Sequence, residues 1–261
     1  GFQKINLPQS RQLYKHQDIA ISKSCNDKNM VVSTGTGSGK TESFLIPVLN
    51  HIVKEQDAGK LTPGVRALLI YPMNALANDQ VERLREVLST TPEITFGCYT
   101  GQTREKYEDA LTEYKSLNSG SLPIKNELIC RKQMKQTPPH ILITNYAMLE
   151  YLMLRPDDSV FFSFEYADKW KYIVLDEAHV YSGSTGIEVA MLLRRLNAKL
   201  DNANIRYILT SATLGNESQN DEVAQFARNL CDSNFESSDV IRAHKIIPRT
   251  ERTKQCLKIE F

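Results

Sequence analysis

A lysine and two carboxylates are the residues of this sequence whose types and spacing best suit phosphate chemistry. Lys40 ends the glycine-rich segment STGTGSGK, while Asp176 and Glu177 directly follow the apolar run IVL. Glycines let the backbone turn tightly and bring its N–H groups against phosphate oxygens. A lysine at this place reaches the β- and γ-phosphates of a nucleotide. A cluster of Gly, Ser and Thr can also be an ordinary turn, so its surroundings must decide.

The glycine-rich segment lies where a phosphate-binding loop is expected. The run MVVST (30–34) predicts a strand before it, and a helical pattern begins near Lys40, whose N-terminal end favours an anion. Thr34 stands five residues before Gly39, where the general pattern has glycine. The hydroxyl of Thr41 is expected to ligate Mg²⁺. We expect ATP to bind here through Thr36, Gly37, Ser38, Gly39, Lys40, Thr41 and Glu42.

The acidic pair ends a second predicted strand. Asp176 is expected to hold Mg²⁺, largely through the water shell that this ion keeps. Glu177 is expected to orient and polarise the attacking water. An acidic pair at a strand end can also cap a helix, but the phosphate loop upstream favours the catalytic interpretation. The predicted catalytic residues are then Lys40, Asp176 and Glu177, and the predicted metal ligands are Thr41 and Asp176.

Hydroxyl residues follow the next apolar run. The segment LTSATLGN (209–216) places Thr210, Ser211 and Thr213 at a strand end, and His179 stands two residues after Glu177. Ser and Thr often bond to their own backbone at such a turn, and a lone histidine is more often structural than catalytic. The residues alone leave both interpretations of this segment open.

Short apolar runs separated by helical patterns must position these groups. The predicted strands are 30–34, 65–71, 94–99, 140–144, 171–176 and 205–211. Their continuous Ile, Val and Leu runs suit parallel strands that are covered on both faces. One apolar helical stripe is formed by Ala77, Val81, Leu84 and Leu88, and another by Val189, Leu192, Leu193, Leu196 and Leu200. This alternation predicts an α/β fold with a doubly wound, mostly parallel sheet.

Composition limits the class of protein. The chain has 261 residues, 41% apolar and 24% charged, with a net charge of +1, as in ordinary globular domains. The charge gives no argument for a nucleic-acid partner, although charge can be local. Five scattered cysteines without a CxxC pair argue against disulfides and zinc. Without a signal peptide or a run long enough to span a bilayer, we expect a cytoplasmic protein with no membrane partner.

Two segments stand apart from the strand and helix pattern. Residues 101–139 are polar and are expected to be an inserted loop or helical excursion. Residues 236–261 lack a convincing strand and helix unit, and are expected to be a linker with basic residues at Arg242, Lys245, Arg249, Arg252 and Lys254. The ATP-binding domain is therefore expected to span residues 29–235, after an N-terminal segment of residues 1–28.

Taken together, the residues resemble the first RecA-like domain of a superfamily 2 helicase of the DEAH-box type, over roughly residues 10–235. LYKHQ resembles the adenine-reading Q motif, TGTGSGKT motif I and YPMNALANDQ motif Ia. YTGQT resembles motif Ib, ITNYAML the following strand-end motif, DEAH motif II and SAT motif III. Two longer segments, PPHILITNYAMLEYLMLRP and DEAHVYSGSTGIEVAMLLRRL, are similar to the bacterial YprA-like group, which includes mitomycin-repair and phage-defence-associated helicases.

The resemblance implies a RecA-like P-loop domain with helices on both faces of the sheet, and an enzyme that uses ATP and Mg²⁺. It implies a nucleic-acid-dependent ATPase, namely a 3′-to-5′ DNA helicase or translocase in DNA repair or phage defence. DNA rather than RNA would be the partner, alongside subunits of a defence or repair complex.

The same resemblance assigns roles to residues. Gln17, in the Q-motif-like helix, would read adenine, and His179 would bridge to Ser211 or Thr213 to couple nucleotide state to domain closure. The nucleic-acid backbone would be contacted by Pro72, Asn74, Thr100, Gly101, Thr144 and Asn145. Strand-end loops suit this task, since their N–H groups and short hydroxyls hold phosphate without reading bases.

The sequence contains no run of the QxxGRxGR type. The arginines that complete such a site are therefore expected on a second RecA-like domain of the same parent protein. A catalytic arginine contributes about 10³–10⁵ in turnover. We expect this chain to be the N-terminal half of a motor, able to bind nucleotide but nearly inactive alone.

Two other functions remain open: a double-strand DNA translocase that does not unwind, and a nucleotide-gated scaffold of a defence complex. The intact Lys40, Asp176 and Glu177 argue against a degenerate site. Within residues 101–139, the segment ELICRKQMKQ is either a solvated helix face or a patch that contacts nucleic acid, and its basic residues are Arg131, Lys132 and Lys135.

Overall fold

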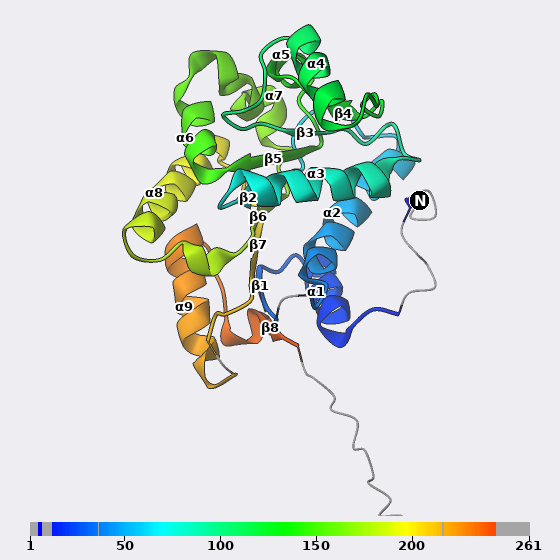
Figure 1. The fold of residues 1–261 in the computed structure, drawn as a ribbon. Coiled ribbons are helices and arrows are strands. Elements are labelled where there is room, and N and C mark those ends of the chain that lie inside the picture. Colours follow the sequence, from blue (N-terminus) through cyan, green and yellow to red (C-terminus); the bar gives the residue numbers. More distant parts are fainter. Residues whose placement is uncertain (1–4, 7–11, 36, 216, 244–261) are drawn as a thin grey trace, which may run out of the picture.

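A parallel sheet forms the centre of the molecule (Figure 1). The computed structural model describes residues 5, 6, 12–35, 37–215 and 217–243. The sheet has eight strands in the order β4-β3-β5-β2-β6-β7-β1-β8, and every pairing is parallel. The strands are β1 (Met30–Ser33), β2 (Ala67–Tyr71), β3 (Phe96–Cys98), β4 (Glu127–Leu128), β5 (Ile141–Asn145), β6 (Tyr172–Leu175), β7 (Arg206–Ser211) and β8 (Val240–Arg242). All six strands expected from the apolar runs are present.

Helices cover both faces of this sheet (Figure 1). The α-helices are α1 (Lys15–Cys25), α2 (Lys40–Asp57), α3 (Asn74–Leu88), α4 (Tyr107–Leu117), α5 (Arg131–Gln136), α6 (Tyr146–Leu154), α7 (Phe164–Ala167), α8 (Gly183–Leu200) and α9 (Asn220–Cys231). Short 3₁₀ helices are η2 (Pro156–Phe162), η3 (Ala178–Val180), η4 (Glu217–Gln219) and η5 (Ser237–Asp239). The two predicted apolar stripes are the buried faces of α3 and α8.

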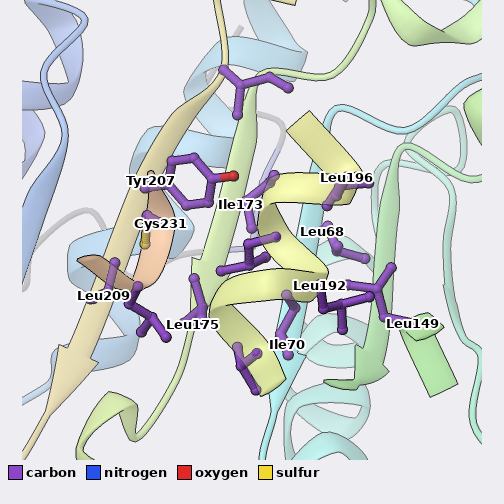
Figure 2. Packing of buried hydrophobic residues seen from close by; sticks show 14 of the residues in the cluster. Leu68, Ile70, Leu149, Ile173, Leu175, Leu192, Leu196, Tyr207, Leu209 and Cys231 are labelled. Carbon is purple, nitrogen blue, oxygen red and sulfur yellow. The ribbon is translucent and has the colours of Figure 1, made fainter. Parts of the chain in front are cut away.

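Alternate residues of the strands lie on opposite faces of the sheet and belong to two separate hydrophobic cores. In β2, Leu68 and Ile70 face α6, α8 and α9, whereas Ala67 and Leu69 face α1, α2 and α3. Figure 2 shows the first core, in which Leu192 of α8 packs against this face of the sheet. A fully buried Leu or Ile contributes roughly 1.5–3 kcal/mol. Two buried faces explain why the strands are continuous apolar runs.

The polar segment 101–139 is part of the sheet. It folds as α4, β4 and α5, and β4 pairs with β3 through Phe96 with Glu127 and Gly97 with Leu128. The guanidinium of Arg85 in α3 makes two 2.8 Å contacts with the carboxylate of Glu127. The expected excursion is thus an added edge strand held by a paired, buried charge.

The C-terminal boundary of the sheet lies later than residue 235. Val240–Arg242 form β8, which pairs in parallel with β1, so the segment expected to be a linker contributes an edge strand. The short run VIR gave no recognisable strand pattern, because three residues are too few for a periodicity. The basic residues Lys245, Arg249, Arg252 and Lys254 lie outside the described residues.

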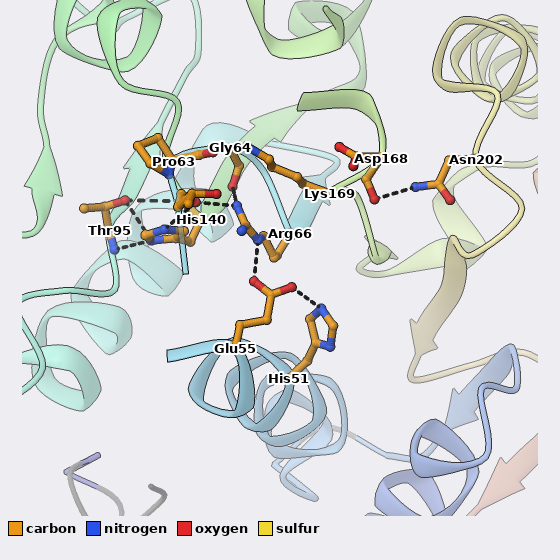
Figure 3. Close-up of polar contacts among 11 residues, drawn as sticks. His51, Glu55, Pro63, Gly64, Arg66, Thr95, His140, Asp168, Lys169 and Asn202 are labelled. Carbon is orange, nitrogen blue, oxygen red and sulfur yellow. Dashed lines mark hydrogen bonds and ion pairs between the residues drawn. The ribbon is translucent and has the colours of Figure 1, made fainter. Parts of the chain in front are cut away.

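A polar network lies at the N-terminal ends of the central strands β2 and β5 (Figure 3). Arg66 is 2% exposed, pairs with Glu55 at 2.8 Å and donates to the carbonyls of Thr62 and Gly64. Nδ1 of His140 accepts the N–H of Thr95 at 2.9 Å. Burial, followed by the charge of Arg66, lowers the pKa of His140 to about 4. These contacts connect the segments that precede β2, β3 and β5.

Two remaining expectations concern thiols and membranes. Cys25, Cys98, Cys130 and Cys231 are free thiols in the structure, and Cys256 lies outside the described residues. Within the described ranges, no helix combines the length and apolar character needed to span a bilayer.

Candidate nucleotide and nucleic-acid site

The loop between β1 and α2 turns through two glycines. Gly37 and Gly39 have φ angles of 72° and 77°, which residues with a Cβ rarely adopt. A Cβ on Gly39 would lie 2.4 Å from Nε2 of Gln17, so a larger residue would also collide. The predicted nucleotide residue Thr36 lies outside the described residues. Glycine at these two positions lets the loop curl over the start of α2.

Thr34 departs from the general loop pattern but has a place in the structure. Its side chain is buried, and its hydroxyl lies 2.6 Å from the hydroxyl of Ser38, across the loop. Its N–H donates to the carbonyl of Ser211 at 3.0 Å. The backbone of Thr34 therefore connects the loop to the end of β7, and its hydroxyl adds a contact across the loop that glycine could not make.

Lys40 and Glu177 meet across the site. The Nζ atom of Lys40, the first residue of α2, lies 3.2 Å from Oε1 of Glu177. Glu177 follows β6 with φ 48° and ψ 48°, a left-handed conformation that is strained for a residue with a Cβ. The fold therefore imposes an uncommon backbone in order to aim this carboxylate at the phosphate loop.

Asp176 lies beside Glu177 in a mostly buried position. Burial raises the pKa of its carboxyl group, and the charge of Glu177 adds to the rise. The hydroxyl of Thr210 in β7 donates to Oδ1 of Asp176 and acts in the opposite direction, as does the charge of Lys40. A buried carboxylate with a raised pKa is stabilised by a nearby cation.

The side chains suit Mg²⁺. Carboxylate and hydroxyl oxygens, as in Asp176 and Thr41, are the hard ligands that this ion prefers. Oε2 of Glu177 is buried and accepts no hydrogen bond from a described residue, although His179 Nδ1 lies 3.4 Å away. In the described part of the chain, no three His, Cys, Asp or Glu side chains form a metal cage. Mg²⁺ commonly takes one or two carboxylates and completes its shell with phosphates and water.

Gln17 joins α1 to the phosphate loop. It is 2% exposed. Its Nε2 donates to the carbonyl of Gly39 at 2.9 Å, and its Oε1 accepts the N–H of Tyr14 at 2.9 Å. The ring of His16 stacks on that of Tyr14, and burial lowers the pKa of His16. This glutamine therefore already has a structural contact with the loop.

Glu42 links the phosphate-loop helix to α3. Its carboxylate is 2.6 Å from the guanidinium of Arg83, and the residue is 8% exposed. The sequence predicts Glu42 among the nucleotide-binding residues, and the structure places its charge against α3. A buried carboxylate needs such a partner, because an unpaired charge is costly to bury.

The three residues expected to couple nucleotide state to domain closure lie together. Nδ1 of His179 is 3.0 Å from the hydroxyl of Ser211, and the same hydroxyl accepts the N–H of Thr213 at 3.2 Å. His179 is also close to Glu177. The ends of β6 and β7 are thus joined through one hydroxyl.

The six residues expected to contact nucleic acid divide into exposed and internal groups. Gly101 is exposed, and Pro72, Asn74 and Asn145 are half-buried. Nδ2 of Asn145 donates to Oδ1 of Asn74 at 2.8 Å, while its Oδ1 accepts the N–H of Met148 and caps α6. These contacts fix the two asparagines side by side at the ends of β2 and β5.

Thr100 and Thr144 have buried side chains. The hydroxyl of Thr144 donates to the carbonyl of Tyr99 at 2.7 Å, and the residue is fully buried. The hydroxyl of Thr100 accepts the N–H of Gln102 at 3.3 Å. Both hydroxyls are used inside the protein, where they shape the loop that carries Gly101.

A model of the DEAD/DEAH box helicase family matches residues 14–221, a range that includes Gln17, the phosphate loop, the DEAH segment and the SAT segment. The chain belongs to the DEAD/DEAH box helicase family. This confirms the resemblance drawn from the sequence, and the parallel sheet with helices on both faces confirms the expected fold class.

Two curated relatives are similar over most of this chain. Druantia protein DruE of Escherichia coli (strain UMEA 4076-1) is 32% identical over 302 residues, covering 81% of this chain and 16% of that protein. The ATP-dependent helicase YprA of Bacillus subtilis (strain 168) is 30% identical over 208 residues, covering 78% of this chain and 23% of that protein. The chain thus spans less than a quarter of the length of either relative.

Solved helicase structures share the fold. The DUF1998 helicase MrfA bound to DNA superposes with a TM-score of 0.67 at 26% identity, covering 90% of this chain and 28% of that one. The complex of MrfA with DNA and AMPPNP gives a TM-score of 0.66 at the same identity, covering 91% and 27%.

Several residues of this helicase domain were not assigned a role from the sequence. Arg83 neutralises Glu42, and Thr210 donates to Asp176. Arg242 of β8 donates to the hydroxyl of Ser33 at 3.1 Å and to the carbonyls of Leu214 and Gly215. Only the hydroxyl cluster around Thr210 gave a signal in the sequence. The arginines gave none, because their partners are distant along the chain.

Proposed function

We propose that this chain is the ATP-binding half of a nucleic-acid-dependent motor, a 3′-to-5′ DNA helicase or translocase. The observation that carries the proposal is the contact of Lys40 with Glu177 across the phosphate loop at 3.2 Å. It is supported by the link from His179 to Ser211 at 3.0 Å, and by family membership. An intact lysine and an intact acid argue for turnover rather than for nucleotide binding alone.

The proposed chemistry assigns one task to each side chain. Lys40 and the loop N–H groups bind the β- and γ-phosphates of ATP. Thr41 and Asp176 hold Mg²⁺, which neutralises charge that develops on the phosphates. Glu177 accepts a hydrogen bond from the attacking water and aligns it with the γ-phosphorus. Gln17 adds recognition of adenine to its contact with Gly39.

The proposed motor needs a second RecA-like domain of its parent protein. An arginine from that domain would stabilise the transferred phosphoryl group, with an effect of about 10³–10⁵ on turnover. His179, Ser211 and Thr213 would then report the nucleotide state to the closing interface. The length of the helicase relatives, several times that of this chain, supports this part of the proposal.

DNA is the proposed track, held at the ends of β2, β3 and β5. The structural relative MrfA was solved bound to DNA, and this supports the proposal together with the grouping of Asn74, Asn145 and Gly101 at one edge of the sheet. Such backbone contacts are independent of base sequence. Repair or phage defence is the proposed pathway, on the resemblance to helicases with these roles.

The test is ATP hydrolysis by the full-length protein with single-stranded DNA, duplex DNA, single-stranded RNA or no nucleic acid. Glu177→Gln is the matched control, since it keeps the shape of the side chain and loses water activation. Strong stimulation by DNA that is absent in this variant is the expected result. No stimulation by any nucleic acid, with nucleotide still bound, would instead favour the gated scaffold.

Direction and unwinding need a second assay. Strand displacement from duplexes with a 3′ or a 5′ overhang should proceed only from the 3′ overhang. Displacement of a triplex strand without separation of a duplex would identify a double-strand translocase and overturn the helicase proposal.

A further inference from the structure

The helix α5 of the polar segment 101–139 lies against the loop that follows β3. The N–H groups of Arg131 and Lys132 donate to the carbonyls of Arg104 and Glu105 at 2.9 and 3.1 Å. The start of α5 is therefore attached to the far end of this loop. The helix packs against β4 and η2, and Met134 of α5 lies next to Gly97 of β3 (Figure 1).

The side chain of Arg131 reaches under the tip of the loop. Its NH2 atom (the second guanidinium nitrogen) donates to the carbonyl of Thr100 at 3.0 Å and more weakly to that of Gly101 at 3.5 Å. Its guanidinium also lies over the ring of Tyr99, 5.2 Å from the centroid. One side chain thus contacts three consecutive residues of the loop.

The planar peptide bond between Thr100 and Gly101 determines which of its polar groups faces the outer surface. In a trans peptide the carbonyl of one residue and the N–H of the next point in opposite directions. Because the carbonyl of Thr100 points at Arg131, the N–H of Gly101 points away from it. Gly101 is exposed, a Cβ built on it would meet nothing within 4 Å, and its N–H has no acceptor among the described residues.

The Tyr99 ring beneath Arg131 is held by its own contact with η2, next to an ion pair of α5. Lys135, one turn further along α5, pairs with Glu105 at 2.7 Å and lies 3.9 Å from Asp158. The hydroxyl of Tyr99 donates to the same Asp158 at 2.6 Å. The ring on which Arg131 rests is therefore itself fixed from η2.

We propose that Arg131 is a positioning residue for nucleic-acid binding by the loop 99–103. It orients the peptide plane between Thr100 and Gly101 so that an N–H donor, and the positive end of that peptide dipole, face a backbone phosphate. The proposal rests on the proposed function. It assigns α5, within the polar segment 101–139, the task of bracing this loop, and separates Arg131 from Lys132, whose side chain is exposed.

The first test needs no nucleic acid. Amide hydrogen exchange of residues 100–103 is compared in the wild type, Arg131→Met and Lys132→Met, which carry the same change in charge at neighbouring positions. Exchange in the loop should be faster by about tenfold or more in Arg131→Met, as expected for a lost charged hydrogen bond, and unchanged in Lys132→Met. Equal exchange in all three proteins would overturn the proposal.

The second test measures affinity for a fluorescent poly(dT) strand at several salt concentrations. Arg131→Met should weaken binding about tenfold while the slope of log affinity against log salt stays that of the wild type, because Arg131 contacts no phosphate. A direct contact would reduce that slope by about 0.7 on a single strand, and this result would overturn a positioning role. Lys132→Met should keep the wild-type affinity.

Two further readouts complete the design. Arg131→Lys retains a donor but not the planar group that lies over Tyr99, so it should restore part of the affinity and of the exchange protection. It also serves if Arg131→Met does not fold. Unaltered ATP binding shows that the nucleotide site is intact. If the wild type itself fails to bind poly(dT), the proposed function fails, whereas hydrogen exchange still decides the role of Arg131.

Discussion

Nζ of Lys40 lies 3.2 Å from Oε1 of Glu177, so the lysine that is proposed to bind phosphate is also the partner of the carboxylate that is proposed to activate water. ATP phosphates must then compete with Glu177 for the same cation. The pair couples nucleotide binding to release of the carboxylate, since an ammonium group held by phosphate attracts Glu177 less strongly.

Glu177→Gln should therefore bind a non-hydrolysable ATP analogue a few-fold more tightly than the wild type while turnover falls by at least about 100-fold, as for loss of a catalytic base. Lys40→Ala should lose affinity for the analogue. Calorimetric titration and a phosphate-release assay measure the two quantities. Weaker binding by Glu177→Gln would show that the carboxylate does not compete for Lys40.

Gln17→Ala tests the link between α1 and the phosphate loop. The contact of Gln17 with the carbonyl of Gly39 at 2.9 Å predicts that this variant weakens ATP and GTP binding alike, by about three- to tenfold for one lost hydrogen bond. Any further loss confined to ATP measures adenine recognition. If GTP binding is unaffected, the contact with Gly39 does not support the loop.

Thr210→Val removes the hydroxyl that donates to Asp176. Burial already raises the pKa of this carboxyl group and Thr210 opposes the rise, so the pKa in the variant should be higher. The role proposed for Asp176 in holding Mg²⁺ requires the ionised carboxylate, so metal binding should weaken as pH falls, and should do so at higher pH in the variant. We expect about tenfold more Mg²⁺ to be required for half-maximal ATPase activity. Thr210→Ser retains the hydroxyl and should behave like the wild type.

His140 should make folding sensitive to acid. Its pKa is about 4 in the folded protein and 6.5 ordinarily, so the unfolded chain binds the proton more tightly. The contribution of neutral His140 to the free energy of unfolding is complete above pH 6.5 and is lost as the pH falls toward and through 4. The free energy of unfolding should be lower by about 2 kcal/mol at pH 5 than at pH 7 from this group.

Urea unfolding at a series of pH values measures this effect. His140→Asn is the matched variant, because its amide oxygen can still accept the N–H of Thr95 but does not titrate. Its unfolding free energy should change less between pH 7 and 5 than that of the wild type. Identical pH dependence of the two proteins would contradict the role of His140.

The central fold could be predicted because the buried strands are unbroken apolar runs. Three to five such residues in a row, as in β5 and β2, leave few alternatives. The edge strands β4 and β8 have only two and three residues, and the pairing of Glu127 with Arg85 places a charge where an apolar residue would mark a strand. Their formation depends on neighbours that no local pattern specifies.

Some contacts of the site could be predicted from the sequence and others could not, for a similar reason. Lys40, Asp176 and Glu177 stand in motifs whose spacing reflects strand ends, so the sequence predicted that they would be brought together. The contact of Arg83 with Glu42 spans 41 positions, and that of Arg131 with Thr100 spans 31. Such pairs depend on tertiary packing, and the basic residues of α5 could equally have been a solvated face.

The left-handed backbone at Glu177 means that folding and turnover favour different residues at this position. Most residues with a Cβ lose about 1–2 kcal/mol in this region of backbone space, whereas glycine lacks the Cβ and asparagine can offset the cost with a local side-chain hydrogen bond. A library of all substitutions at residue 177, sorted by thermal stability, should therefore place asparagine or glycine above the native residue. The same library sorted by growth under selection for the motor should retain glutamate alone. Residue 177 is then a position at which a consensus chosen for stability would remove the enzyme's activity.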